Sequence, residues 1–396
     1  MCSSSSRSSR SFPAVFARGG TSNGLVILRR HLPPSSEWPA VFASAMGSPD
    51  PYGRQLNGMG SGISSTSKIC ILAPSSRSDS DVEFTFVQVG FKDGSLDLAG
   101  NCGNMLSAIG PISLDEGLLA RTPRVELDQS GEFHTAVVRI FNTNTGKLIL
   151  SRFRVAGDPP KYCLEGDFEM DGVPGRQSRI VLSFLDPAGA KTGRALPTGN
   201  PVDVLSLPDG YTIKASLVDV SNPGVFFRVS DLGLKNPDAL DPAALEANPD
   251  LKGRLEQIRR AGAAMMGLDP ETQSVPKIVL IFPTPPRGFS GDVDIRCLAL
   301  SMGQAHKVVP LTLALCLGAA ARFPDTFPCQ LSRSRGNGDT ITIGHPSGKI
   351  EVGTNVSNGS VVSAELHRTA RVLMKGEVFY DCVTAWRKLP REICNE

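Results

Sequence analysis

Two segments of this chain predict helices that are apolar on every side. Residues 103–113 bring Met105, Leu106 and Ile109 together, and residues 308–323 read VVPLTLALCLGAAARF. A helix with so little polar surface lies buried, because none of its faces gains from contact with water. A strand and a glycine-containing turn precede each segment. The same order of strand, turn and apolar helix therefore occurs twice, and it predicts two similar α/β halves.

The remaining segments predict mainly strands. With 40 Gly and 30 Pro among 396 residues, the chain favours tight turns and short strands over long helices. An exception is the zone from Asp241-Pro242 to Gly267, where a cap, a proline at the first helical position and a closing glycine predict helix. Strand patterns occur at residues 12–28, 68–72, 82–91, 122–155, 179–187, 209–229, 277–286, 292–303 and 370–380.

The balance of charge disfavours some classes of partner. The net charge is only +2, from 41 basic and 39 acidic residues, so no overall field favours nucleic acid or a membrane. No apolar run approaches the roughly 20 residues that span a bilayer. Nine cysteines without a CxxC pair predict free thiols in a reducing compartment. Five histidines without HxH or HxxxH spacing give a zinc site little support.

The first eleven residues, MCSSSSRSSRS, are rich in serine and contain no acidic residue. A strand pattern follows at once and leaves little room for an amphipathic targeting helix. We therefore expect residues 1–11 to be a disordered tail on a cytoplasmic protein, rather than a mitochondrial transit peptide.

The sequence AGNCGNML contains the first candidate site. Cys102 lies between two glycines at a strand-to-helix junction, beside the free backbone N–H groups of a helix N-terminus. Such groups stabilise a thiolate and can also bind a carboxylate. Asn101, Gly103 and Asn104 would add donors on either side. The alternative is a tight turn that tolerates a cysteine.

The sequence SGISSTSK contains the second candidate site. Ser64, Ser65, Thr66 and Ser67 precede Lys68, directly after a glycine-rich turn. Nucleotide binding is disfavoured, because the glycine that precedes the lysine of a phosphate loop is missing. Hydroxyl groups and an ammonium group suit a carboxylate substrate instead. The alternative is a solvated serine loop, although the apolar string KICIL that begins at Lys68 favours an ordered position.

Two further groups of polar residues are candidates for substrate binding. In ARGGTSNG, Arg18 offers paired donors for a carboxylate, with Thr21 and Ser22 beside it, and the alternative is a plain glycine hairpin. For the histidines in the second half, the alternative to substrate binding is a structural role. The candidates there are Ser301, His306, His345 and Ser347.

At these motifs the sequence resembles the PrpF family, which includes 2-methylaconitate cis-trans isomerases, methylitaconate Δ-isomerases and fungal aconitate Δ-isomerases. The matching strings are PAVFARGGTSNG, GMGSGISSTSKI and GNCGNMLSAIG, with further similarity at NPGVFF, SMGQAH and HPSGKI. They occur in order along nearly the whole chain.

This resemblance implies a fold like that of diaminopimelate epimerase. Such a fold has two pseudo-symmetric domains, each a sheet wrapped around a central helix, with the active site between them. We expect the N-terminal domain at residues 12–185 and the C-terminal domain at 186–371. Residues 372–396 would return to the first domain as a strand.

The resemblance also implies a reaction. Lys68 and Cys102 match the family's proton-transfer pair, which implies an isomerase without cofactor or metal that acts on a small tricarboxylate. The sequence leaves open which of the two is the base, and whether the protein is a homodimer. The family's usual pattern is RGGTSKG, whereas this chain has Asn23 in place of the lysine. That departure bears on substrate specificity rather than on reaction class.

The identity of the substrate is open. The serine-rich start and the loop additions look eukaryotic and favour the fungal branch, hence conversion of cis-aconitate to trans-aconitate. The alternative substrates are 2-methylaconitate and methylitaconate. A non-catalytic partner of an aconitase-like enzyme is disfavoured by the intact Lys68 and Cys102. An amino-acid epimerase would need a second facing thiol, and Cys297 lies within an apolar strand pattern.

Overall fold

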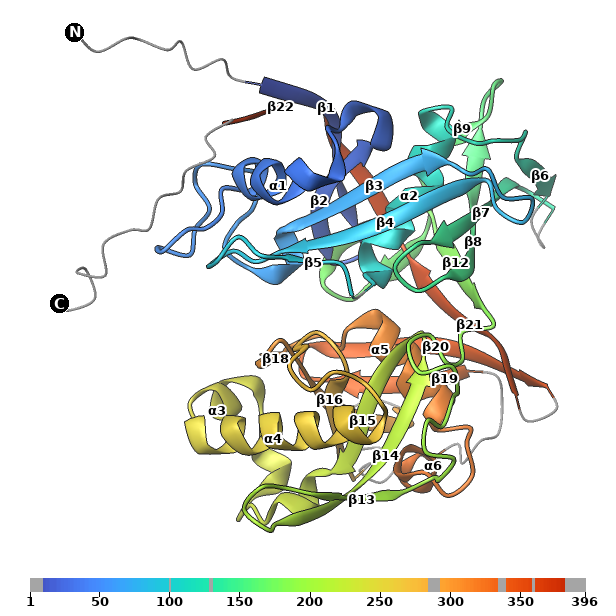
Figure 1. The fold of residues 1–396 in the computed structure, drawn as a ribbon. Coiled ribbons are helices and arrows are strands. Elements are labelled where there is room, and N and C mark those ends of the chain that lie inside the picture. Colours follow the sequence, from blue (N-terminus) through green and yellow to red (C-terminus); the bar gives the residue numbers. More distant parts are fainter. Residues whose placement is uncertain are drawn as a thin grey trace, which may run out of the picture.

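Strands dominate the structure, and two buried helices stand inside the sheets that these strands form (Figure 1). The computed structural model describes residues 10–99, 101–127, 131–283, 293–333, 340–357 and 360–381. No helix in these ranges is long and apolar enough to cross a membrane.

The first half is built around helix α2 (Gly103–Asp115), which is buried from Met105 to Leu114. Strands from both ends of the chain surround it, among them β1, β2, β7, β8 and β22. The strands of this half are β1 (Arg10–Gly19), β2 (Ser22–Leu28), β3 (Lys68–Pro74), β4 (Val82–Val89), β5 (Leu96–Asp97), β6 (Arg124–Leu127), β7 (His134–Asn142), β8 (Lys147–Ala156), β9 (Lys161–Tyr162), β12 (Ile180–Leu185) and β22 (Ala370–Tyr380). A separate hairpin consists of β10 (Phe168–Met170) and β11 (Val173–Gln177).

The second half repeats this plan around helix α5 (Leu311–Ala320), all of whose residues are buried. Strands β14, β15, β19, β20 and β21 contact it. The strands of this half are β13 (Asp203–Ser206), β14 (Thr212–Val220), β15 (Asn222–Arg228), β16 (Lys277–Phe282), β17 (Ile295–Ser301), β18 (Gln304–His306), β19 (Thr340–His345), β20 (Gly348–Ser357) and β21 (Ser360–Arg368).

One strand pair joins the two sheets. β12 pairs antiparallel with β21, and Ile180 lies opposite Arg368. The chain then continues into β22, which pairs antiparallel with β1 in the first half. Arg10 and Ser11, which we expected in the tail, are therefore the first residues of β1, because they pair with the end of β22. Residues 1–9 and 382–396 lie outside the described residues, and the domain boundaries remain predictions.

Four further α-helices belong to the described fold, besides five short 3-10 helices. Helix α1 (Trp38–Met46) packs beside the first sheet, and α4 (Pro249–Met265) covers the second. The single helix that we expected from Asp241 onward is two helices, α3 (Pro242–Glu246) and α4. It breaks because Pro249 cannot continue a helix, and the Asn248 side chain caps the new start. Helix α6 (Phe327–Leu331) follows α5.

The predicted fold class is confirmed. A single hydrophobic cluster contains residues of both central helices, including Leu106 and Ile109 of α2 and Leu313 and Leu317 of α5. A helix that is apolar on all sides can bury every face only inside such a core. In Figure 1 the two halves stack one above the other, with α2 in the upper half and α5 in the lower.

Candidate active site

The two central helices meet at their amino-terminal ends, at a place we call the helix junction. Gly103, the first residue of α2, lies against Leu311, the first residue of α5. A Cβ atom on Gly103 would lie 2.9 Å from the Cβ atom of Leu311, so a larger residue would force the helices apart. Helix N-termini carry partial positive charge, so the junction favours an anion.

Cys102 is the residue that caps α2 at the helix junction. Its backbone is extended, and its carbonyl oxygen accepts a hydrogen bond from the backbone N–H of Leu106 at 3.0 Å. The thiol is half-buried and forms no disulfide. The predicted position of this cysteine at a helix N-terminus is confirmed, while its catalytic role stays a prediction.

Lys68 is the first residue of β3, and only 8% of it is exposed. Its Nζ donates a hydrogen bond to Oε1 of Gln88 at 2.8 Å and lies 5.2 Å from the centre of the Phe86 ring. Gln88 is itself held, because its Nε2 donates to the carbonyl oxygen of Ser67 at 2.9 Å. No ion pair joins Lys68 to a carboxylate in the described part of the chain.

Gly24 allows Lys68 to approach α2. It lies opposite Lys68 in the parallel pair of β2 and β3, and a Cβ atom there would lie 3.1 Å from both the Cβ of Lys68 and the Cε of Met105. Burial raises the pKa of the Cys70 thiol well above its usual range, and the nearby Cys102 and Lys68 also act on it, with opposite signs. Both candidate proton carriers therefore act electrostatically on one buried thiol.

The serine-rich loop before Lys68 divides into two parts. Ser67 is buried, and its hydroxyl donates to Oε1 of Gln55 at 2.6 Å, while Thr66 is hydrogen-bonded within the loop. Ser64 and Ser65 are half-buried. Within the described ranges, neither of their hydroxyls forms a hydrogen bond. They are therefore the members of this loop that retain hydroxyls for a ligand.

The structure gives Arg18 partners within the protein. Its guanidinium donates to the carbonyl oxygen of Gly20 at 2.7 Å, to Oε1 of Gln177 at 2.5 Å and to Oγ1 of Thr369 at 3.0 Å. These bonds tie the β1–β2 turn to β11 and to the residue before β22. Arg18 therefore shapes the turn, and its contact with substrate stays a prediction.

Thr21 and Asn104 bond to each other. The Asn104 side chain donates to Oγ1 of Thr21 at 3.1 Å and accepts from the Thr21 backbone N–H at 3.2 Å, which fixes the β1–β2 turn on α2. Ser22 is buried in that turn. Asn101 differs, because its Oδ1 is buried without a hydrogen-bond partner among the described residues. Its amide is therefore the better candidate for contact with a ligand.

Of the candidates in the second half, His306 and Ser301 are linked to the helix junction. Burial, with the ammonium groups of Lys277 and Lys68, lowers the pKa of His306 to about 4, so its imidazole is neutral at pH 7. Ser301 contributes a backbone hydrogen bond to this histidine. His306 in the second half therefore interacts electrostatically with Lys68 in the first.

His345 and Ser347 lie in different surroundings. The backbone N–H of Ser347 donates to the carbonyl oxygen of Lys307 at 3.0 Å. His345 lines a hollow on the second half together with Arg296 and Asp238. Burial lowers the pKa of His345, and Asp171 opposes that shift. No described contact links either residue to Lys68 or Cys102.

Comparison with known proteins agrees with this arrangement. The family model described as PrpF protein matches residues 9–381. The chain belongs to the PrpF family. It is 37% identical over 385 residues to 3-methylitaconate isomerase of Eubacterium barkeri, with 93% of this chain and 97% of the relative covered. It is 34% identical over 391 residues to 2-methyl-aconitate isomerase of Cupriavidus necator, with 92% and 96% covered.

Solved structures show the same relation. The crystal structure of methylitaconate-delta-isomerase is similar with a TM-score of 0.75 and 34% identity, over 97% of this chain and 100% of that one. A hydroxyproline epimerase from Agrobacterium vitis, 15% identical with a TM-score of 0.52, covers 95% of this chain and 94% of its own, and it shares the fold alone. This PrpF-family chain is an enzyme of the isomerase class.

At the helix junction of this PrpF chain, the N-cap position is a cysteine in α2 and a proline in α5. Helix α5 is preceded by Pro310 and begins with Leu311 and Thr312. Cys316 lies inside α5, where it is buried and its thiol donates to the carbonyl oxygen of Val218 at 3.3 Å. Burial raises the pKa of Cys297 to about 12. The two-thiol arrangement of a racemase is therefore missing from the described part of the junction.

Two residues that interact with the candidate proton carriers were absent from our predicted site. They are Gln88, which is hydrogen-bonded to Lys68, and Lys277, which interacts electrostatically with Lys68 and Cys102. Both lie in strands whose patterns indicated ordinary buried strands. The available signal was a polar side chain next to an apolar run, as with Lys277 before IVLIF. That signal is weak, because polar residues commonly begin a strand.

Proposed function

We propose that this chain isomerises an unsaturated tricarboxylic acid by allylic proton transfer, with Lys68 and Cys102 as the two proton carriers. One observation carries the proposal. The buried ammonium group of Lys68, which has no carboxylate partner among the described residues, and the thiol of the N-cap residue Cys102 lie on neighbouring elements, where two helix N-termini meet. Such a site combines groups that exchange protons with a fixed positive potential.

The proposed chemistry moves one double bond. A base removes a proton from the CH₂ group beside the double bond, and the resulting carbanion delocalises through the double bond into a conjugated carboxylate. An acid then donates a proton to the far carbon, so the double bond migrates and the atoms balance. Helix N-termini and Lys68 would stabilise the added negative charge. Since only protons move, this step needs no redox cofactor.

For the substrate we propose cis-aconitate, converted to trans-aconitate, with 2-methylaconitate or methylitaconate as the alternative. Two relatives are named for methylitaconate and methylaconitate, and a third is (4E)-oxalomesaconate Delta-isomerase of Novosphingobium, 36% identical over 377 residues. All of these acids are unsaturated and carry at least two carboxylates. Asn23, where the family pattern has lysine, lies opposite Arg18 in the β1–β2 hairpin and is a candidate determinant of the choice.

Proton NMR in D₂O tests the reaction. Purified protein is mixed with cis-aconitate, and the vinyl and methylene signals are followed with time. We expect trans-aconitate to appear with deuterium at the carbon that gained hydrogen, because both proton carriers exchange with solvent. Parallel samples with 2-methylaconitate and methylitaconate rank the substrates. Failure to convert any of the three acids would refute the proposed function, and unlabelled product would contradict an exchangeable carrier.

A further inference from the structure

Lys277 is a second buried lysine that the proton-transfer pair leaves without a role. It is the first residue of β16, and only 8% of it is exposed. Among the described residues its Nζ donates one hydrogen bond, to the carbonyl oxygen of Ser274 at 2.9 Å. No ion pair joins it to a carboxylate in the described part of the chain. An ammonium group has three donors and a full charge, so one neutral carbonyl leaves most of its bonding capacity unused.

Backbone pairing places Lys277 beside the start of α5. It lies opposite Gly224 in the parallel pair of β15 and β16. Asn222, the first residue of β15, donates from Nδ2 to Oγ1 of Thr312 in the first turn of α5 at 3.2 Å. The ammonium group also interacts electrostatically with Lys68 and Cys102 from the other half. Lys277 therefore belongs to the helix junction.

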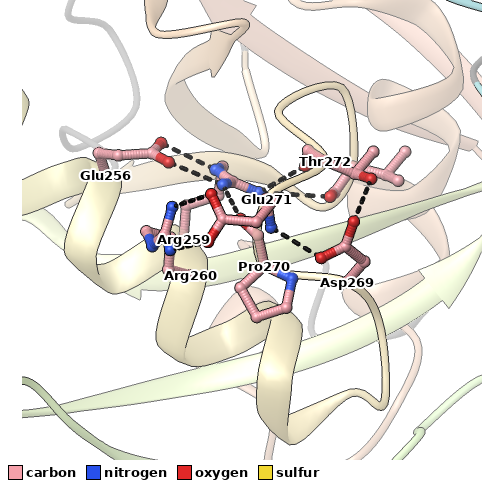
Figure 2. Close-up of polar contacts among 8 residues, drawn as sticks. Glu256, Arg259, Arg260, Asp269, Pro270, Glu271 and Thr272 are labelled. Carbon is pink, nitrogen blue, oxygen red and sulfur yellow. Dashed lines mark hydrogen bonds and ion pairs between the residues drawn. The ribbon is translucent and has the colours of Figure 1, made fainter.

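A polar cluster on α4 fixes the loop that leads to Lys277 (Figure 2). Arg259 is buried and donates to the carbonyl oxygens of Pro270 at 2.5 Å and Thr272 at 2.7 Å. A carboxylate oxygen of Glu256 forms an ion pair with the same guanidinium at 2.7 Å. This clamp sets the course of residues 270–275, including the carbonyl oxygen of Ser274 that receives Lys277. The position of the ammonium group is therefore built into the fold.

Burial of this charge is costly for the protein without a ligand. Burial lowers the pKa of Lys277 to about 8, Asp97 and Cys102 oppose that shift, and Lys68 adds to it. Two buried ammonium groups that act on each other repel, and an anion between them would remove that repulsion. A substrate carboxylate supplies such an anion.

We propose that Lys277 binds a carboxylate of the substrate from the second half, while Lys68 and the α2 N-terminus act from the first. The inference rests on the proposed function and adds a specificity residue to it. It explains why an acid with several carboxylates suits this site, because positive groups reach it from both halves. Lys277 then contributes to binding, and the proton-transfer pair carries out the chemistry.

Binding of a saturated analogue tests this role apart from turnover. Propane-1,2,3-tricarboxylate resembles aconitate but has no double bond, so it cannot react. Isothermal titration calorimetry compares its binding to the wild type, to Lys277→Met and to a matched control, Lys214→Met, at an exposed position of β14. We expect Lys277→Met to weaken binding by about 30-fold or more, the scale for losing one partner of a buried charge pair. The control should bind as the wild type does.

Pentanedioate, which lacks the central carboxylate, adds a second readout. The wild type should prefer the tricarboxylate, and Lys277→Met should lose much of that preference. Thermal unfolding separates this role from a structural one, because removing an unpaired buried charge should leave Tm unchanged or raise it. Lys277→Gln replaces the methionine variant if that variant folds poorly.

Unchanged affinity in the folded variant, or lost turnover at unchanged affinity, overturns the inference. A different outcome would refute the proposed reaction instead: the wild type converts none of the three acids, yet its binding of the analogue still depends on Lys277.

Discussion

Cys102 and Cys163 allow the thiol to be tested with an internal control. Both are half-buried free cysteines, but only Cys102 caps a central helix, whereas Cys163 follows β9. Cys102→Ser should fold normally and lose turnover by about 100-fold or more, because a hydroxyl is far too weak an acid to replace a thiol. Steady-state rates with the preferred acid and circular dichroism check this. Cys163→Ser should keep its rate. Near-normal turnover of Cys102→Ser would remove this thiol from the mechanism.

Lys68 has two possible duties, as a proton carrier and as an electrostatic clamp. Lys68→Arg separates them, because arginine keeps the charge but does not give up its proton. We expect turnover to fall by about 100-fold or more, the usual scale for general acid–base catalysis. The measurement is kcat and KM for the preferred acid. Turnover within a few-fold of wild type with a raised KM would leave Cys102 as the only carrier and Lys68 as a binding residue.

At the residue scale, local sequence predicted the parts of the site that lie within one motif. Cys102 and Lys68 each follow a glycine-rich stretch, so their surroundings are set by neighbours in the chain. Gln88 reaches Lys68 only through the pairing of β3 with β4, and Lys277 reaches the junction only through the packing of two halves. The partners of Arg18 lie beyond local sequence for the same reason, since Gln177 and Thr369 are distant in sequence.

At the element scale, Arg259 of α4 holds the loop before β16, and Arg260 offers a matched control. Arg259 is buried with its partners, whereas Arg260 pairs with Glu271 at the surface. Arg259→Met should lower the free energy of unfolding by about 3–5 kcal/mol, because Glu256 and several carbonyl oxygens lose their donor. Arg260→Met should cost about 1 kcal/mol or less. Urea unfolding measures both, and equal effects would contradict the clamp in Figure 2.

The β10–β11 hairpin was absent from our strand predictions, although it connects several elements. Gln177 of β11 accepts from Arg18, and Asp171 in the turn accepts from the backbone N–H of Lys349 in β20 at 3.0 Å. Its sequence, FEMDGVPGRQ, has no alternating apolar pattern, because most of its side chains are at least partly exposed. Short exposed strands are held by such tertiary contacts, which periodicity does not register.

At the scale of the whole molecule, the repeated order of strand, turn and apolar helix was enough to predict two halves with a helix inside each. The order of the strands within the sheets could not be predicted from the sequence. Strand β22 pairs with β1 across almost the full length of the chain, and β12 with β21 joins the two sheets. Hydrophobic patterns indicate which face of a strand is buried, but they do not specify its partner.

Neutral histidine at the helix junction makes the stability of the molecule depend on pH. In the unfolded chain an imidazole takes up its proton near pH 6.5, whereas His306 in the folded protein does so near pH 4. Between these values the unfolded state binds more protons, so the free energy of unfolding falls as the pH falls. The groups that act on His306 are Lys277, Lys68, Glu246 and the backbone of Ser301.

His306→Asn, which cannot titrate, isolates this contribution from those of His345 and His367, whose pKa values burial also lowers. Urea unfolding at pH 7 and at pH 5 measures it. The wild type should lose about 2 kcal/mol more than the variant between the two pH values, as proton linkage requires for a shift of this size. Equal losses would show that His306 is protonated in the folded protein. The positive field of Lys68 and Lys277, on which the proposed substrate binding depends, would then be weaker than proposed.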